Sequence, residues 1–122
     1  MSKTILVVDD DKLIREGISA LLKNAGQNVL EASDGKQGLA LALEHKPDLV
    51  VTDVRMPEMT GLAMIAELRA DDWGAKVPVI ILTNDESSDS INQALESGVT
   101  MYFPKTSPPD TLQQQILQMV GE

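Results

Sequence analysis

Short apolar runs alternate with amphipathic stretches along the whole of this 122-residue chain. The runs have the length and composition of β-strands, and the stretches between them repeat apolar residues at helical spacing. We expect five strands, at about 4–8, 28–32, 49–53, 78–83 and 100–103. Alternation of this kind predicts right-handed crossovers and a parallel sheet with helices on both faces.

The five expected helices are marked by apolar residues three or four positions apart. These are Ile14, Ile18, Leu21, Leu22 and Ala25; Leu39, Ala42 and Leu43; Leu62, Ile65 and Leu68; Ile91, Ala94 and Leu95; and Leu112, Ile116, Met119 and Val120. Thr60 is the expected N-cap of the third helix, and Asp110 or Pro109 lies near the start of the last. Gly26 and Gly98 are the expected stops of the first and fourth helices.

Strand composition indicates the order of the sheet. The first, third and fourth runs are almost wholly apolar, as expected for strands that are buried on both faces. The second and fifth runs are mixed, so we place them at the edges. This pattern fits a three-layer flavodoxin-like (βα)5 fold with strand order 2-1-3-4-5. In that order, ligands bind between the first and third strands, beyond their carboxyl ends.

Four of these strands end in polar residues. The first runs into Asp9, Asp10 and Asp11, and the third ends at Asp53. The other two bring the residues Thr83, Tyr102, Pro104 and Lys105 to the corresponding strand ends. Because the carboxyl ends of parallel strands meet at one edge of a sheet, we expect acids, a hydroxyl and an amine to converge there.

Three of these acids, Asp9, Asp10 and Asp53, lie at the expected crevice. Three carboxylates within contact distance repel one another by about 4 kcal/mol for each pair at an effective dielectric constant near 20. A proton can offset this repulsion, but Mg²⁺ offsets it better because it prefers carboxylate and water ligands. A carboxylate is also a nucleophile toward phosphorus, and Asp53 is the best placed of the three. Lys105 and Thr83 are then expected to contact the phosphoryl oxygens.

Each of these residues also has a plainer interpretation. Asp9 or Asp10 is a possible N-cap of the first helix, although we favour Asp11 for that position. Thr83 is compatible with ordinary strand-end hydrogen bonding, and Lys105 with a solvated surface position. Tyr102 is compatible with simple edge-strand packing. A further group of polar residues, Arg69, Asp71 and Asp72, is interpreted as a solvated loop near Trp73 without a functional role.

Composition excludes several classes of function. A net charge of −9 argues against nucleic-acid binding, and the absence of cysteine excludes disulfides and thiolate metal sites. No apolar run is long enough to cross a bilayer, and no signal peptide precedes the first strand. We expect one domain over residues 1–122, in the cytoplasm and away from membranes.

With these four motifs in this order and spacing, the chain resembles the receiver domain of two-component response regulators over essentially its whole length. Residues 53–61, which read DVRMPEMTG, resemble the phosphoacceptor segment of that family and are the most specific signal. The VVDDD segment at 7–11 resembles its acid pair, Leu82-Thr83 its switch threonine, and residues 102–105 its switch aromatic and lysine.

The resemblance implies a function. Asp53 would accept a phosphoryl group from a phosphohistidine of a sensor histidine kinase or a phosphotransfer protein. Asp9, Asp10, Asp53 and the backbone carbonyl of Arg55 would hold Mg²⁺.

The resemblance also implies a switch. Thr83 would move toward the phosphoryl group and Tyr102 would rotate inward. The face of the fourth helix, fifth strand and fifth helix would then bind an output target, or an effector domain that is missing from this chain.

The chain departs from the family pattern at two positions. Thr106 follows Lys105 where the family usually has proline, and Asn84 follows Thr83 where it usually has a small residue. Arg55 and Asp85 occupy the positions that tune phosphate lifetime in the family, and we hypothesise an ion pair between them.

Two alternative functions stay open. The Asp9–Asp11 segment has the Asp-x-Asp pattern of haloacid dehalogenase-like phosphatases, which place their nucleophile on the first strand. A receiver-like interaction domain that no longer uses phosphate is the second alternative, and Asn84 and Thr106 give it some support.

Overall fold

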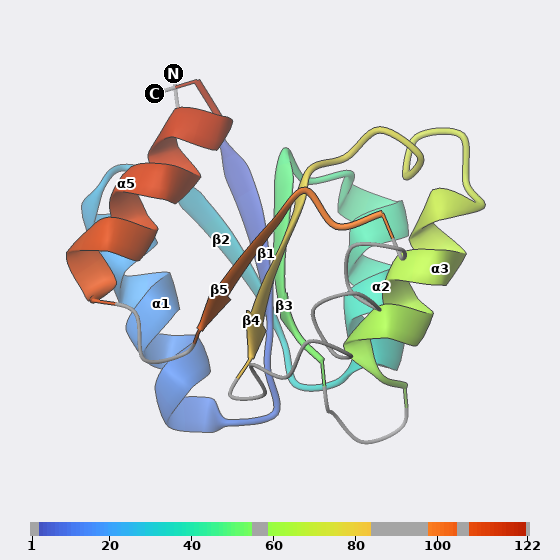
Figure 1. Ribbon diagram of the computed structural model, residues 1–122, viewed down its shortest axis with the longest axis horizontal. Coiled ribbons are helices and arrows are strands. Elements are labelled where there is room, and N and C mark those ends of the chain that lie inside the picture. The colour runs from blue at the N-terminus through green and yellow to red at the C-terminus, as the bar shows by residue number, and fades with distance from the viewer. Residues whose placement is uncertain (1–2, 55–58, 84–97, 105–107, 122) are drawn as a thin grey trace.

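The computed structural model describes residues 3–54, 59–83, 98–104 and 108–121. Five strands form one parallel sheet with helices on both faces (Figure 1). The strands are β1 (Thr4–Val8), β2 (Asn28–Ala32), β3 (Leu49–Asp53), β4 (Val79–Thr83) and β5 (Met101–Pro104), and the described helices are α1 (Lys12–Asn24), α2 (Gly35–His45), α3 (Gly61–Arg69) and α5 (Pro109–Met119).

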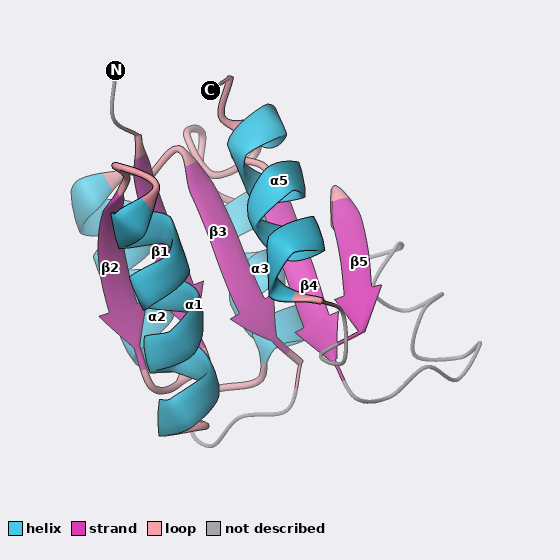
Figure 2. Ribbon diagram, turned by 90° about the vertical axis from the view of Figure 1, so that its left-hand side faces the viewer, coloured by secondary structure: helices cyan, strands magenta, loops and turns pink. Residues whose placement is uncertain are grey.

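The order of the sheet is β2-β1-β3-β4-β5, as expected from the composition of the runs. The observed strands agree with the predicted ranges to within one residue at each end. Figures 1 and 2 show α1 and α5 on one face of the sheet and α2 and α3 on the other. The expected fourth helix, around Ile91–Leu95, lies outside the described residues.

Alternate residues of each central strand enter two separate cores, as the two-residue period of a strand requires. Leu6 and Val8 of β1 pack toward α2 and α3, and Ile5 and Val7 pack toward α1 and α5. All four are at most 1% exposed. A strand that is buried on both faces has to be apolar throughout, which is why the central runs of the sequence are continuous.

The helix ends follow the expected capping chemistry with one addition. Thr60 caps α3 by accepting a hydrogen bond from the backbone N–H of Ala63, and α1 is followed by Gly26 at φ 88°. Pro109 is the first residue of α5, as the pattern of N-terminal proline predicts. Asp34 caps α2 by accepting a hydrogen bond from the backbone N–H of Gln37 at 2.7 Å, a cap that was not predicted from the sequence.

Candidate functional site

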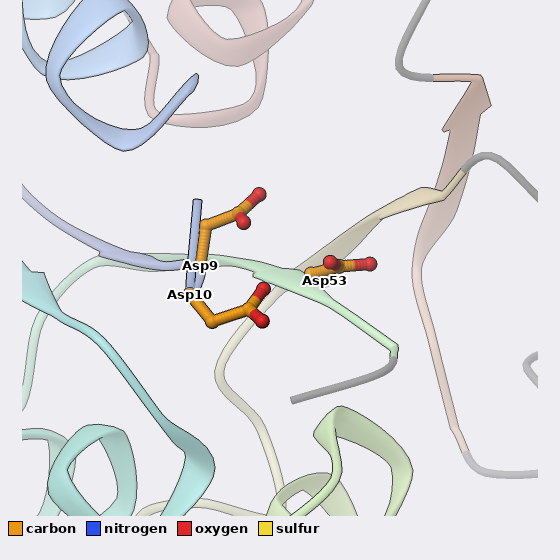
Figure 3. Close-up of side chains that lie close together, drawn as sticks. All are labelled: Asp9, Asp10 and Asp53. Carbon is orange, nitrogen blue, oxygen red and sulfur yellow. The ribbon is translucent and has the colours of Figure 1, made fainter. Parts of the chain in front are cut away.

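Three carboxylates meet at the carboxyl end of the sheet, between β1 and β3. Asp9 and Asp10 follow β1, and Asp53 is the last residue of β3. One oxygen from each carboxylate lies within 4.8 Å of the other two. Figure 3 shows the three side chains around one small volume. Asp9 is 1% exposed, Asp53 is 8% exposed and Asp10 faces solvent. The predicted convergence of the three acids is confirmed.

The backbone after β1 is fixed by several hydrogen bonds. The N–H of Asp9 donates to the carbonyl of Ala32 at 3.1 Å, at the end of β2. One carboxylate oxygen of Asp9 accepts from the N–H of Asp11 at 2.9 Å. Asp11 itself caps α1 by accepting from the N–H groups of Leu13 and Ile14. The N-cap is therefore Asp11, and neither Asp9 nor Asp10 caps α1.

Asp53 is held where β3 passes into the following loop. Its Oδ1 accepts from the N–H of Val54 at 2.6 Å, and the hydroxyl of Thr52 donates to its backbone carbonyl at 2.9 Å. The N–H of Gly61, at the start of α3, donates to the carbonyl of Val54 at 2.8 Å. The start of α3 thus lies directly against the backbone of the residue that the sequence predicts to be the phosphoacceptor.

The other predicted site residues are described only in part. Thr83 ends β4 and pairs in register with Pro104 of β5, so its backbone lies at the same edge of the sheet as Asp53. Tyr102 of β5 is half-buried and packs against the α2–α3 core. The positions of Arg55 and Lys105, and the side chain of Thr83, lie outside the described residues. Their roles stay predictions.

The interpretation of Arg69 as part of a solvated loop was wrong. Its guanidinium is half-buried and donates three hydrogen bonds to backbone carbonyls. The acceptors are Gly74 at 2.7 Å, Val77 at 2.6 Å and Gly98 at 2.6 Å. Burial lowers the pKa of this guanidinium from its ordinary value. These acceptors are brought together only by the fold, so no local pattern in the sequence indicates them.

The cluster of acids allows a prediction about stability. We expect Asp10→Asn to raise the free energy of unfolding without added divalent metal by about 1 kcal/mol. The substitution removes repulsion among three nearby charges, but Asp10 is exposed, so water screens most of that repulsion. Urea titrations at low salt measure this effect, which should shrink as salt is added. Asp72→Asn removes the same charge from an exposed loop and serves as the control. If both variants raised the free energy of unfolding by the same amount, the three clustered acids would repel one another no more than an exposed acid is repelled by the rest of the protein.

Comparison with known proteins identifies the class to which this fold and site belong. Residues 5–117 match the family described as the response regulator receiver domain. The phosphate regulon transcriptional regulatory protein PhoB of Pseudomonas aeruginosa is 37% identical over 112 residues, which cover 92% of this chain and 49% of the relative. The response regulator MprA of Mycolicibacterium vanbaalenii is 36% identical over 119 residues, covering 98% of this chain and 49% of the relative.

Two solved structures extend the comparison. The chemotaxis response regulator CheY4 of Vibrio cholerae superposes with a TM-score of 0.91 at 30% identity, covering 98% of this chain and 99% of that one. The receiver domain of the sensor histidine kinase PA1611 of Pseudomonas aeruginosa, solved with a magnesium ion coordinated in its active site cleft, gives a TM-score of 0.91 at 28% identity and full coverage of both chains.

The chain belongs to the receiver domain family of response regulators, the signalling modules of two-component systems. This membership gives no support to the phosphatase alternative. The chain spans about half the length of the curated transcriptional regulators that it matches, with 49% coverage of PhoB. None of the described helices is long and apolar enough to cross a membrane.

Proposed function

We propose that Asp53 accepts a phosphoryl group and that this changes the affinity of the domain for an output partner. A carboxylate oxygen of Asp53 would attack the phosphorus of a phosphohistidine on a sensor kinase or a phosphotransfer protein. A phosphorus–oxygen bond forms and the phosphorus–nitrogen bond breaks. The imidazole nitrogen leaves with the electron pair of that bond and takes up a proton. The observation that carries this proposal is the grouping of Asp9, Asp10 and Asp53 at the end of the sheet.

The donor set fits a hard divalent cation. Three carboxylate oxygens within 4.8 Å of one another are ligands of the kind that Mg²⁺ prefers, and two of the three side chains are buried. Asp9, Asp10, Asp53 and the carbonyl of Arg55 would hold the ion. When bound, it would supply positive charge against the phosphoryl oxygens. Lys105 and Thr83 would contact the same oxygens from the ends of β5 and β4.

The switch and the partners are further parts of the proposal. The movement of Thr83 and Tyr102 would change the face of the expected fourth helix, β5 and α5, which would bind a target protein or an effector domain. The family's relatives with transcriptional roles support an output of that general kind. We further propose a cytoplasmic signalling domain over residues 1–122 that catalyses only its own phosphorylation and dephosphorylation and contacts neither nucleic acid nor membrane directly.

The test is phosphorylation by a small donor. We expect incubation with acetyl phosphate and Mg²⁺ to add one phosphoryl group to the wild-type protein, measured by intact mass. Asp53→Asn should remove this labelling, because the amide is a poor nucleophile toward phosphorus. Asp11→Asn is the matched control: it removes an acid two residues from Asp9 but keeps a good N-cap, so labelling should persist.

Three other outcomes would contradict the proposal. Labelling that survives in Asp53→Asn would place the acceptor elsewhere. Labelling that is lost in Asp9→Asn but kept in Asp53→Asn would favour a nucleophile on the first strand. A wild-type protein that is never labelled, either by acetyl phosphate or by a phosphorylated kinase, would favour a receiver-like interaction domain that does not use phosphate.

A further inference from the structure

Arg15 joins three parts of the structure beside the acid cluster. It lies in the first turn of α1, with its side chain 16% exposed. Its Nη1 donates to the backbone carbonyl of Asp9 at 2.8 Å. Its Nε forms an ion pair with Oε1 of Glu31 on β2 at 3.4 Å. The guanidinium thus bridges the end of β1 and the edge strand β2 from the helix that follows the site.

The carbonyl that Arg15 binds belongs to the peptide unit between Asp9 and Asp10. The N–H of Asp9 is already fixed by the carbonyl of Ala32, and its carboxylate accepts from Asp11. With the carbonyl also held, the direction of this peptide is fixed, and so is the Cα from which the Asp10 side chain leaves. Asp10 is the exposed member of the three acids, so its position depends on the backbone that carries it.

We propose that Arg15 is a positioning residue for the divalent cation site, holding the Asp9–Asp10 peptide so that both carboxylates face Asp53. Glu31 orients the guanidinium for this contact. A planar guanidinium suits this task because its nitrogens point in fixed directions, so that Nη1 donates to a carbonyl while Nε faces a carboxylate across an ion pair. The inference rests on the proposed function, in that it assumes a cation between Asp9, Asp10 and Asp53.

A charge effect and a positioning effect predict opposite changes in cation affinity when Arg15 is replaced. Arg15 is itself positive and lies next to a site for a positive ion. By charge alone, Arg15→Met would therefore strengthen cation binding. By positioning, it would weaken binding, and loss of a group that orients a metal ligand typically costs about tenfold or more in affinity. The direction of the change thus separates the two roles.

Mn²⁺ serves as the probe, with the free ion measured by electron paramagnetic resonance at constant ionic strength. We expect Arg15→Met to bind Mn²⁺ about tenfold more weakly than the wild type. Arg15→Lys keeps the charge and one possible donor to the Asp9 carbonyl, so it should recover part of the loss. Lys12→Met is the matched control, because Lys12 is an exposed cation on the same helix and its ion pair, at 3.9 Å, is with Glu16 rather than with the Asp9–Asp10 backbone.

Circular dichroism without metal checks that each variant is folded, and Arg15→Lys keeps the test usable if Arg15→Met is not. Mn²⁺ binding by Arg15→Met that is as tight as, or tighter than, wild type would overturn the inference, provided that Asp10→Asn loses binding. That result would leave the proposed function intact. A wild-type protein that does not bind Mn²⁺ would overturn the cation site itself, and with it the role of Arg15.

Discussion

Gly61→Ala is expected to destabilise the protein by about 3 kcal/mol, the upper part of the range for inserting one methyl group into a closely packed position. A Cβ on Gly61 would overlap the backbone carbonyl of Asp53 and approach the Thr52 hydroxyl at 3.2 Å. The obstacle is main chain on a central strand, which cannot rotate away as a side chain could. Either α3 or the end of β3 has to move.

The same substitution should impair the site. The movement would break the hydrogen bond from the N–H of Gly61 to the Val54 carbonyl and shift the residue that follows Asp53. We therefore expect phosphorylation by acetyl phosphate to slow in the folded fraction as well. Urea unfolding followed by circular dichroism measures the loss of stability, and intact mass against time measures the labelling.

Gly17→Ala is the control for this prediction. Gly17 also lies within a helix, α1, but a Cβ there would have nothing within 4 Å. Replacing an exposed glycine inside a helix with alanine should stabilise the protein by about 0.5–1 kcal/mol. The two variants make the same chemical change and should shift stability in opposite directions. If Gly61→Ala were as stable as the wild type, the close approach of α3 to Asp53 would be wrong.

The fold could be predicted because its determinants are local. Strands buried on both faces have to be apolar throughout, and helices on a sheet have to repeat apolar residues at helical spacing. Both patterns can be read directly from the chain. The strand order also followed from composition, because the mixed β2 and β5 lie at the edges.

The acid cluster could be predicted for a related reason. Its members sit at strand ends, and parallel strands bring their carboxyl ends to one edge of the sheet. Asp9, Asp10 and Asp53 therefore meet even though more than forty positions separate the first two from the last. The switch role of Tyr102 stays a prediction, as do the contacts of Lys105, because neither follows from the backbone position of a strand end.

The contacts of Arg15 and Arg69 could not be predicted from the sequence. Both side chains donate to backbone carbonyls, and a carbonyl has the same chemistry at every residue, so no pattern marks the acceptor. Only the fold decides which carbonyl lies within reach. A charged residue between two predicted elements is most often solvated, and that general expectation was wrong for Arg69.

Arg69→Met is expected to destabilise the protein by about 2–3 kcal/mol, because three carbonyls lose a charged donor at once. The acceptors are the backbone carbonyls of Gly74, Val77 and Gly98. Gly74 lies in the connection between α3 and β4, Val77 lies two residues before β4, and Gly98 lies three residues before β5. The side chain therefore ties the amino-terminal ends of two neighbouring strands to the end of α3. Gly98 fits this role because it has φ +84° and a Cβ there would lie 3.2 Å from Nε of Arg69.

Fluorescence of Trp73, the single tryptophan of the chain, reports on this region directly because Trp73 precedes Gly74 and packs against the α2–α3 core. Arg69→Lys keeps the charge but has one nitrogen in place of the guanidinium fork, so it should recover only part of the lost stability. Lys76→Met removes an exposed cation from the same connection and should change stability by less than about 0.5 kcal/mol.

The three variants separate geometry from charge. If the positive charge alone stabilised this acidic protein, Arg69→Lys would match the wild type and Lys76→Met would lose as much as Arg69→Met. If the hydrogen bonds to the three carbonyls stabilise it, the losses should rank in the order Arg69→Met, Arg69→Lys, Lys76→Met. Since β5 carries Tyr102, loosening its start should also alter the environment of that ring, which the amide and side-chain NMR signals of Tyr102 would report.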